Sequence, residues 1–321
     1  MKGQLPIKGE MEIKICDDEL SEAAWITEKI DELSSNGHPD IEGINVLPQQ
    51  CAVLARNRYV FKELTKIFEE QNREYSLRVS SNQGLLSESL FFKLFDLGLR
   101  VIMNDKDVLH LSEMINLLDC ENEEILSFSD LISSNSLYQA VGRNGAMTIN
   151  EVWVQIQTSG SPFRFSKTLD ALASYCDDES NFPDDNERSL VYNDYLSWRE
   201  RWSTYVRNSS NDERSLAHMM RSIALGITNI SKESGITLST VHMSKGLEFD
   251  IVFIMGLSEG VFPDYRSLNN TAQLDEEQHN MFVSITRSRR LCYLSCAKER
   301  IMPWGDSKTQ KPSRYVTQLM Q

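Results

Sequence analysis

The stretch Ile236–Gly256, ITLSTVHMSKGLEFDIVFIMG, decides the fold. Two apolar runs, 236–240 and 251–256, flank a polar connection, and the second run is nearly continuous, as in a central strand of a parallel sheet. The connection offers a cation at Lys245 and a glycine at Gly246, which permits close backbone approach. A loop of this kind at the end of a strand is suited to hold a phosphodiester backbone. A Lys-Gly pair alone does not identify such a site.

The amino-terminal part of the chain alternates between strand and helix patterns. Apolar residues alternate over 11–15, which predicts a strand, and recur at helical spacing over 20–33. The apolar run 51–55 predicts a buried strand, 60–68 a second helix and 76–79 a further strand. This order predicts an α/β unit with a parallel sheet and flanking helices.

The middle of the chain is mostly helical, and the strand–helix order returns after it. Helices are expected over 88–104 and 108–118, and residues 274–289 predict a helix with Asp275–Glu277 in its first turn, where acidic residues suit the helix dipole. Residues 291–297 predict a strand, with Cys292 and Cys296 as core residues on one face. The predicted organisation is an α/β domain interrupted by a helical insertion, with parts at 1–118, 119–231 and 232–321.

Two tryptophans of the insertion, Trp198 and Trp202, lie four residues apart on one predicted helix. A pair at this spacing is more often a core anchor than a platform for stacking bases. The acidic segment 177–188, with Pro183, is expected to be an exposed loop.

Charge is distributed unevenly along the chain. The net charge of the 321 residues is −14, which argues against broad nonspecific binding of nucleic acid. Residues 232–321 nevertheless carry +1, and from Arg287 to Arg314 eight basic residues stand against two acidic ones, Glu299 and Asp306. Such a basic strip fits a small anionic ligand or one narrow strand contact, or else a solvated surface.

Several classes of protein are disfavoured by composition. No apolar run approaches the roughly 18 residues that span a bilayer, and residues 1–12 lack the apolar core of a signal peptide. The six cysteines form no CxxC pair and have no histidine cluster near them, which argues against a zinc site or a disulfide framework. We expect a soluble cytoplasmic protein, associated with the nucleoid.

Five segments resemble, in order, the motifs of the UvrD/Rep/PcrA-type superfamily-one DNA helicases. Thr240–Asp250 resembles motif V, Thr-x-His-x-x-Lys-Gly-Leu-Glu-Phe, and Gly256–Pro263 resembles its continuation. Asp275–Arg287 looks like motif VI, Pro312–Tyr315 looks like the closing Ser-Arg-Phe, and Ala52–Asn57 looks like motif IV. The resemblance implies a RecA-like second motor domain, interrupted by a reduced form of the family's helical 2B-like subdomain.

The resemblance also implies roles for two arginines at a nucleotide. Arg287 would be the motif VI arginine finger and Arg56 of motif IV a second contact, both reaching the γ-phosphate from one wall of the cleft. Arginine suits this role because it stays charged and can fork onto phosphate oxygens. It would stabilise charge in the transition state of phosphoryl transfer. Taken one at a time, Arg287 is more simply a member of a surface ion pair and Arg56 a charge at the end of a helix.

The remaining implied contacts lie in motif V. Glu248 would contact the ribose and Gly246 the nucleotide, with ATP and Mg²⁺ as cofactors. Thr240, His242 and Lys245 would contact single-stranded DNA. The implied activity is ATP-driven translocation and unwinding of DNA, with 3′ to 5′ polarity.

The sequence departs from the family pattern at three places. Gln278-His279 stands where the family usually has two arginines, and Phe282 replaces a frequent tyrosine. Ala55 precedes Arg56 where the family often has tyrosine. If that aromatic ring packs on adenine, nucleotide affinity is weaker in this chain.

No P-loop pattern, Gly-x-x-x-x-Gly-Lys-Ser/Thr, occurs in the sequence. By the resemblance, the P-loop belongs to a first RecA-like domain that would precede residue 1, so we expect a truncated form or a gene fragment that hydrolyses no ATP alone. The implied partners are single-stranded DNA, that first domain and a protein bound by the insertion, with no membrane. The alternatives are a non-catalytic helicase-like adaptor and a helicase that works with a nuclease on another chain.

Overall fold

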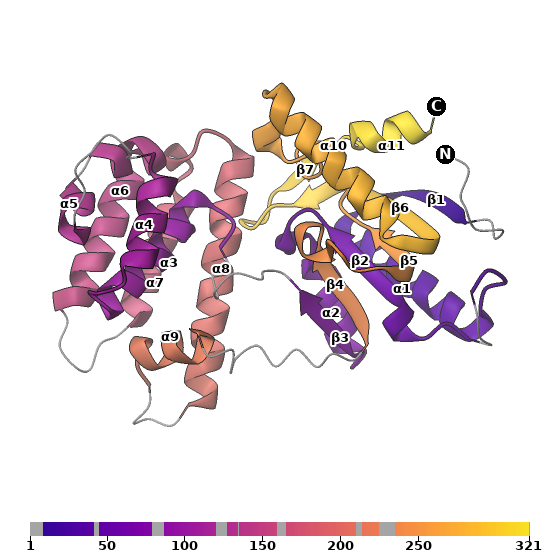
Figure 1. Cartoon of the computed structure of the whole chain (residues 1–321), viewed down its shortest axis with the longest axis horizontal. Helices are drawn as coiled ribbons and strands as arrows, with labels where there is room; N and C mark the ends of the chain where they lie inside the picture. Colours follow the sequence, from indigo (N-terminus) through magenta and orange to yellow (C-terminus); the bar gives the residue numbers. More distant parts are fainter. Residues whose placement is uncertain are drawn as a thin grey trace. The chain divides into compact units, whose positions relative to one another are not determined.

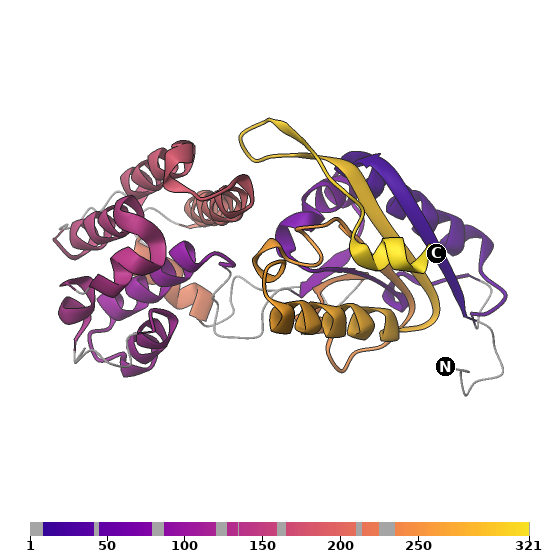
Figure 2. The same cartoon turned by 90° about the horizontal axis from the view of Figure 1, so that it is seen from above.

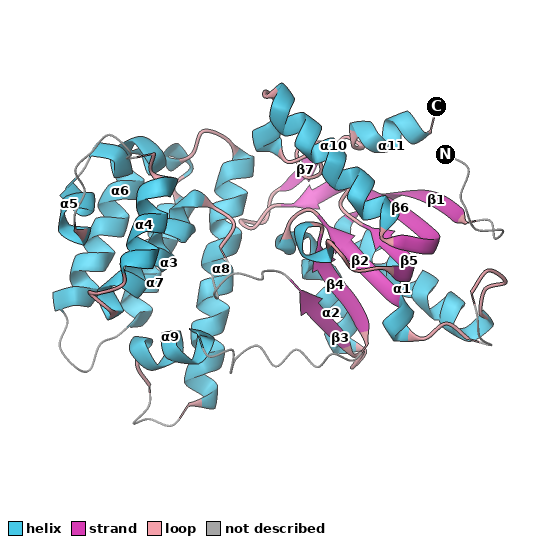
Figure 3. Cartoon of the chain, in the orientation of Figure 1, coloured by secondary structure: helices cyan, strands magenta, loops and turns pink. Residues whose placement is uncertain are grey.

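The computed structural model describes residues 9–41, 45–78, 87–119, 127–133, 135–158, 165–209, 214–224 and 235–320. The chain divides into two compact units (Figure 1), one made of Met1–Ser81 with Ser231–Gln321 and the other of Asn82–Ile230. The first unit combines helices and strands, and the second is helical (Figure 3). Each unit has a hydrophobic core of its own.

The first unit is built on a mostly parallel sheet whose strands come from both ends of the chain. Its order is β1-β6-β5-β2-β4-β3, and β7 pairs antiparallel with β6. The strands are β1 Glu10–Asp18, β2 Cys51–Ala55, β3 Tyr75–Arg78, β4 Ile236–Thr240, β5 Phe249–Ile254, β6 Ser288–Ile301 and β7 Ser307–Thr309. The predicted α/β class with a parallel sheet is confirmed, although Val79, the last residue of one predicted strand, lies outside the described residues.

Helices cover both faces of the sheet (Figure 2). On one face, α1 (Glu19–Asn36) and α2 (Lys62–Glu70) pack on every second residue of β2, including Val53. On the other face, α10 (Thr271–Thr286) and α11 (Arg314–Leu319) pack on the alternate residues, including Leu54. The alternation of side chains along each strand therefore gives one sheet two separate cores.

The second unit is a helical bundle. Its helices are α3 Leu90–Met103, α4 Val108–Leu117, α5 Phe128–Ser133, α6 Asn135–Thr158, α7 Phe165–Asp177, α8 Asp185–Asn208 and α9 Leu216–Ala224. The indole of Trp153 on α6 is fully buried and donates to the carbonyl of Phe95 on α3, at 3.4 Å. This close approach requires Gly98, because a Cβ there would lie 2.3 Å from the Trp153 ring. Trp198 is 3% exposed in the same core, as its spacing predicts.

The boundary of the helical unit falls near residue 81, earlier in the chain than the predicted position of 118. Helix α3 is apolar around most of its circumference, and its buried residues join those of α6, α7 and α8 in one cluster. A helix that is apolar on all sides must be enclosed by other helices. The other predicted boundary, at 231, lies outside the described residues.

Part of the segment 177–188, predicted to be a loop, is the start of α8, capped by Asp184.

A buried carboxyl group of α8 holds the start of α3. Asp194 accepts hydrogen bonds from the backbone nitrogens of Glu88 and Ser89, at 3.0 and 2.8 Å, and from the hydroxyl of Ser89, at 2.6 Å. Burial, together with the Glu88 carboxyl, raises the pKa of Asp194 to about 7, although the bonds from Ser89 and Glu88 oppose the rise. The carboxyl group therefore binds its proton more tightly in the folded protein than in the unfolded chain.

We predict that Asp194→Ala lowers the free energy of unfolding by about 2 kcal/mol or more, because it leaves buried donors without an acceptor. Asp194→Asn should cost less, because the amide oxygen still accepts. In the wild type, the stabilisation linked to this proton is present below the ordinary pKa of 3.8 and is lost as the pH rises through about 7. Urea unfolding at several pH values would measure this. An Asn variant with the same pH dependence as the wild type would contradict the prediction.

Candidate functional site

The motif IV and motif V residues meet at the carboxyl edge of the sheet, where β2, β4 and β5 end. Strands β2 and β4 are parallel neighbours with Ala55 opposite Thr240, and the nitrogen of Val241 donates to the carbonyl of Ala55 at 3.0 Å. Arg56 and His242, which follow these two strands, therefore lie at the same edge. Thr240 itself is buried, at 7% exposure. The structure thus brings together three of the predicted site residues.

Arg56 forms an ion pair that crosses from the sheet to α10. Its Nε donates to both carboxylate oxygens of Glu277, at 2.8 and 3.0 Å. The side chain of Glu277 is 4% exposed and that of Arg56 is 17% exposed. A pair this well shielded from solvent is held more firmly than a surface pair, because breaking it leaves a charge uncompensated.

Glu277 was expected in the first turn of its helix, and this expectation is wrong. Helix α10 begins one turn earlier, at Thr271, where the side chain of Asn270 caps it by accepting from the nitrogen of Gln273 at 3.2 Å. Glu277 consequently lies inside the helix and faces the sheet. Its role there is to accept from Arg56 instead of favouring the helix dipole.

A second carboxyl group extends the network. The backbone nitrogen of Asp264 donates to Glu277 at 3.0 Å, and the side chain of Asp264 accepts two bonds from the Arg266 guanidinium, at 2.8 and 3.0 Å. Asn57, next to Arg56, donates to the same carboxylate at 3.3 Å. Burial opposes ionisation of Asp264, but the bonds and charge of Arg266 hold its pKa below 3.8. The segment around Asp264 is thereby tied to both β2 and α10.

His242 lies beside this network, in the short 3₁₀ helix His242–Ser244 that follows β4. Partial desolvation lowers the pKa of its imidazole below 6.5, and the positive charges of Arg56 and Lys245 lower it further. The carboxylates of Glu277 and Glu276 oppose this change. At neutral pH the imidazole is therefore uncharged and can accept or donate one hydrogen bond at each nitrogen.

The connection from β4 to β5 carries the remaining motif V residues from the carboxyl edge to the opposite edge. Lys245 and Gly246 are exposed. Gly246 has φ of +86°, and a Cβ placed there would meet nothing within 4 Å. The glycine is needed for its backbone conformation, which other residues adopt only with strain. The surrounding space is open to a ligand.

Arg287 lies at the far end of α10 from the Arg56 pair, immediately before β6. Its Nε donates to the carbonyl of Val283 at 3.0 Å, and one terminal nitrogen donates to the carbonyl of Leu247 at 2.9 Å. The other terminal nitrogen donates to Thr286 at 3.2 Å. Ten residues of helix, about 15 Å, separate Glu277 from Arg287. The structure does not bring the two guanidinium groups together, and their convergence on one phosphate stays a prediction.

Four of the eight basic residues in the strip predicted over 287–314 form ion pairs within the chain. Glu248 pairs with Arg289 at 3.2 Å, and both side chains are 55% exposed. Lys298 pairs with Asp17 at 2.8 Å and Arg300 with Glu19 at 3.4 Å. Part of the positive charge of this strip is therefore engaged by carboxylates within the fold.

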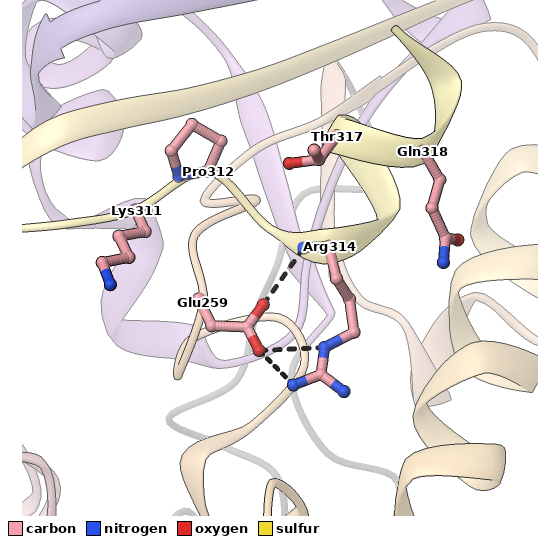
Figure 4. A pocket seen from close by; sticks show the side chains of 6 residues that line it. All are labelled: Glu259, Lys311, Pro312, Arg314, Thr317 and Gln318. Carbon is pink, nitrogen blue, oxygen red and sulfur yellow. Dashed lines mark hydrogen bonds and ion pairs between the residues drawn. The ribbon is translucent and has the colours of Figure 1, made fainter. Parts of the chain in front are cut away.

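Arg314 of the closing motif is also paired. Its guanidinium and backbone nitrogen both bond to the carboxylate of Glu259 beside a shallow pocket that Lys311 and Thr317 also line (Figure 4). Arg314 stands at the start of α11, and Glu259 follows β5. The resemblance of the closing motif thus corresponds to a contact that holds α11 against the sheet unit.

No metal site appears among the described residues, where no three His, Cys, Asp or Glu side chains are grouped to hold an ion. Of the helices in the described ranges, none has the length and apolar character to cross a membrane.

The six predicted contacts to ATP and DNA other than Arg287 lie on or beside the connection between β4 and β5 or at the end of β2.

The segments that resemble motifs IV and V thus meet at the carboxyl edge of a mostly parallel sheet, and the segment that resembles motif VI forms α10 on one face of it. Comparison with known proteins bears on the same segments. Residues 165–299 match the UvrD-like helicase C-terminal domain family. The match concerns these residues, and with the relatives below it is consistent with the C-terminal half of a UvrD/PcrA-type helicase.

Individual relatives are ATP-dependent DNA helicases named PcrA. The Bacillus subtilis protein is 24% identical over 339 aligned positions, which cover 94% of this chain and 43% of that protein. The Staphylococcus epidermidis and Staphylococcus aureus proteins are 35% and 34% identical over 119 residues, covering 36% of this chain and 16% of theirs. The chain thus spans less than half the length of these relatives.

Sequence reasoning missed two residues of the site, Glu277 and Asp264. The signal for Glu277 was present, because an acidic residue placed seven positions after the Asn270 cap falls two turns into the helix. For Asp264, the pattern Asp-x-Arg at 264–266 indicated a local pair, but nothing in the sequence links it to Asn57.

We predict that the pKa of His242 lies below 6.5 and rises in Arg56→Gln, because the substitution removes a neighbouring positive charge. Titration of the imidazole protons by NMR would measure both values, with His242→Asn to assign the signal. Arg73→Gln, which removes an arginine paired with Asp31, is the matched control and should leave the value unchanged. A His242 that titrates above 6.5 in the wild type would refute the prediction.

Proposed function

We propose that this chain is the second motor domain of an ATP-dependent DNA helicase, with an inserted helical unit. Arg56 and Arg287 would contact the γ-phosphate of ATP bound against a separate P-loop domain. When bound, ATP with Mg²⁺ supplies the phosphoryl group whose transfer drives movement. The chain's part is to hold positive charge where negative charge develops. The 3′ to 5′ polarity of translocation belongs to the same proposal.

The proposed nucleotide contact is supported by the hydrogen bonding of the Arg56 guanidinium. Its guanidinium is anchored through Nε, and among the described residues neither terminal nitrogen has a hydrogen-bond partner. Two adjacent terminal nitrogens of one guanidinium match the spacing of two phosphate oxygens. A non-catalytic adaptor would have no use for such a group, which favours the enzyme.

The DNA contact is assigned to the connection between β4 and β5. Gly246 leaves its backbone open, Lys245 is exposed, and His242 is uncharged at neutral pH. Lys245 can contact a phosphate through its charge. His242 and the backbone at Gly246 can contact a phosphate, a sugar or a base without carrying a charge. With a net charge of −14 on the chain, the contact with single-stranded DNA is expected to be narrow and weak.

We predict no ATP turnover by the purified chain alone, because its residues supply one wall of the nucleotide site. Fused behind the P-loop part of Bacillus subtilis PcrA, it should hydrolyse ATP in a DNA-dependent manner. Arg287→Ala should then lower turnover about 10³-fold. Phosphate release, measured with and without single-stranded DNA, tests both parts.

Lys298→Ala is the matched control for that experiment, because it removes a cation on β6 whose partner is the exposed Asp17. It should leave turnover within about threefold of the parent fusion. Turnover by the chain alone that Arg287→Ala abolishes would overturn the single-wall proposal. A folded fusion without turnover would favour the adaptor.

We predict that the chain binds a fluorescent oligothymidine weakly, with an affinity that falls steeply as salt is added. Lys245→Gln should weaken binding several-fold and reduce the salt slope by about 0.7, the value for one phosphate contact on a single strand. Lys66→Gln, an exposed lysine of α2 on the other face of the sheet, is the control with the same charge change. Equal effects of the two substitutions in anisotropy titrations would exclude the assignment.

A further inference from the structure

The bond between Arg56 and Glu277 uses only one of the three nitrogens of the guanidinium. Nε donates to both carboxylate oxygens, at 2.8 and 3.0 Å. The terminal nitrogens carry four of the five N–H donors of the group, and within the described ranges they bond to nothing. The planar guanidinium is therefore fixed through Nε, and its two terminal nitrogens remain available to a ligand.

Glu277 is itself held in place from several directions. Its carboxylate accepts from the nitrogen of Asp264 at 3.0 Å and lies 3.5 Å from the side-chain nitrogen of Asn280, one turn further along α10. The residue is 3% exposed. A carboxylate bonded in this way cannot turn to follow a mobile arginine, so the arginine must adopt the orientation that the carboxylate sets.

Arg287 has no carboxylate that anchors it in this way, and its hydrogen bonding differs from that of Arg56. All three of its nitrogens donate to groups of its own neighbourhood, the carbonyls of Val283 and Leu247 and the hydroxyl of Thr286. Each terminal nitrogen of Arg287 thus has one of its two N–H groups engaged, which leaves one donor on each for a phosphate. Arg56 keeps all four terminal N–H groups for a ligand among the described residues, because the nitrogen that it uses is Nε.

We propose that Glu277 is a positioning residue for Arg56, which orients the guanidinium so that its terminal nitrogens face the γ-phosphate. This inference rests on the proposed function, because it assigns Arg56 to the nucleotide. It gives Glu277 a role that acts through Arg56 and involves no contact between the carboxylate and the nucleotide.

The test in the PcrA fusion compares Glu277→Gln in two backgrounds. With Arg56 intact, we expect turnover to fall about tenfold to 100-fold with little change in KM, because a guanidinium misplaced by an ångström loses transition-state contacts. In an Arg56→Gln background, Glu277→Gln should lower turnover no further. Glu277→Asp, which keeps the charge, should restore part of the activity and serves if the Gln variant does not fold.

Two outcomes of that comparison would overturn the inference. Equal losses in both backgrounds would show that Glu277 does not act through Arg56. Higher turnover in Glu277→Gln would show that the carboxylate withholds the arginine from the nucleotide.

A second measurement on the chain alone separates this inference from the proposed function. NMR exchange of the Arg56 Nε proton with water should be slow in the wild type and much faster in Glu277→Gln, while the Nε proton of Arg73 stays unchanged. This result would support the anchoring even if the fusion showed no turnover. Fast exchange in the wild type would overturn it whatever the fusion does.

Discussion

The pairing of β2 between β4 and β5 is the constraint on which the rest of the structure depends. Strand β2 comes from the amino-terminal segment, whereas β4 and β5 come from the segment that follows the helical unit. Parallel pairing places their carboxyl ends at one edge. Arg56 and His242, far apart in sequence, become neighbours for this reason, and α10 supplies the carboxylate that joins Arg56 to the second layer. An insertion between β3 and β4 leaves this arrangement intact.

The sequence predicted the strands of the sheet well because each short apolar run, such as 51–55 or 251–256, is enclosed on both faces and leaves an unbroken signal. Motif spacing singled out Arg56 and Arg287, whose roles at a nucleotide stay a prediction. It did not locate Glu277, because the acidic run at 275–277 is compatible with an exposed first turn or with a buried second turn. The difference lies in the cap at Asn270, one polar residue among several candidates. Helix α3 was assigned to the first part of the chain for a related reason: periodicity shows that a helix is buried but not which core encloses it.

The two arginines of the proposed nucleotide site are in different energetic states. Arg56 has an anchored base and free outer nitrogens, so a phosphate would add bonds without breaking any. Arg287 donates to three acceptors in its own chain, and each bond exchanged for a phosphate contact reduces the net gain. Leu247 lies on the connection that carries motif V, so the bond of Arg287 to its carbonyl joins the end of α10 to that connection.

Charge pairing bears on how an acidic chain would present the proposed anion site. Four of the eight cations from Arg287 to Arg314 are matched by carboxylates, including Arg300 with Glu19 and Arg314 with Glu259, so these four contribute to the fold and little to the external field. Of the cations in motifs IV and V, the outer nitrogens of Arg56 have no hydrogen-bond partner among the described residues, and Lys245 is exposed. Repulsion between an acidic surface and a polyanion is largely screened beyond the Debye length, about 8 Å in physiological salt, so the few open donors can act on a phosphate at short range. Selective contact with one phosphate or one strand then follows from geometry at short range and does not require a basic protein.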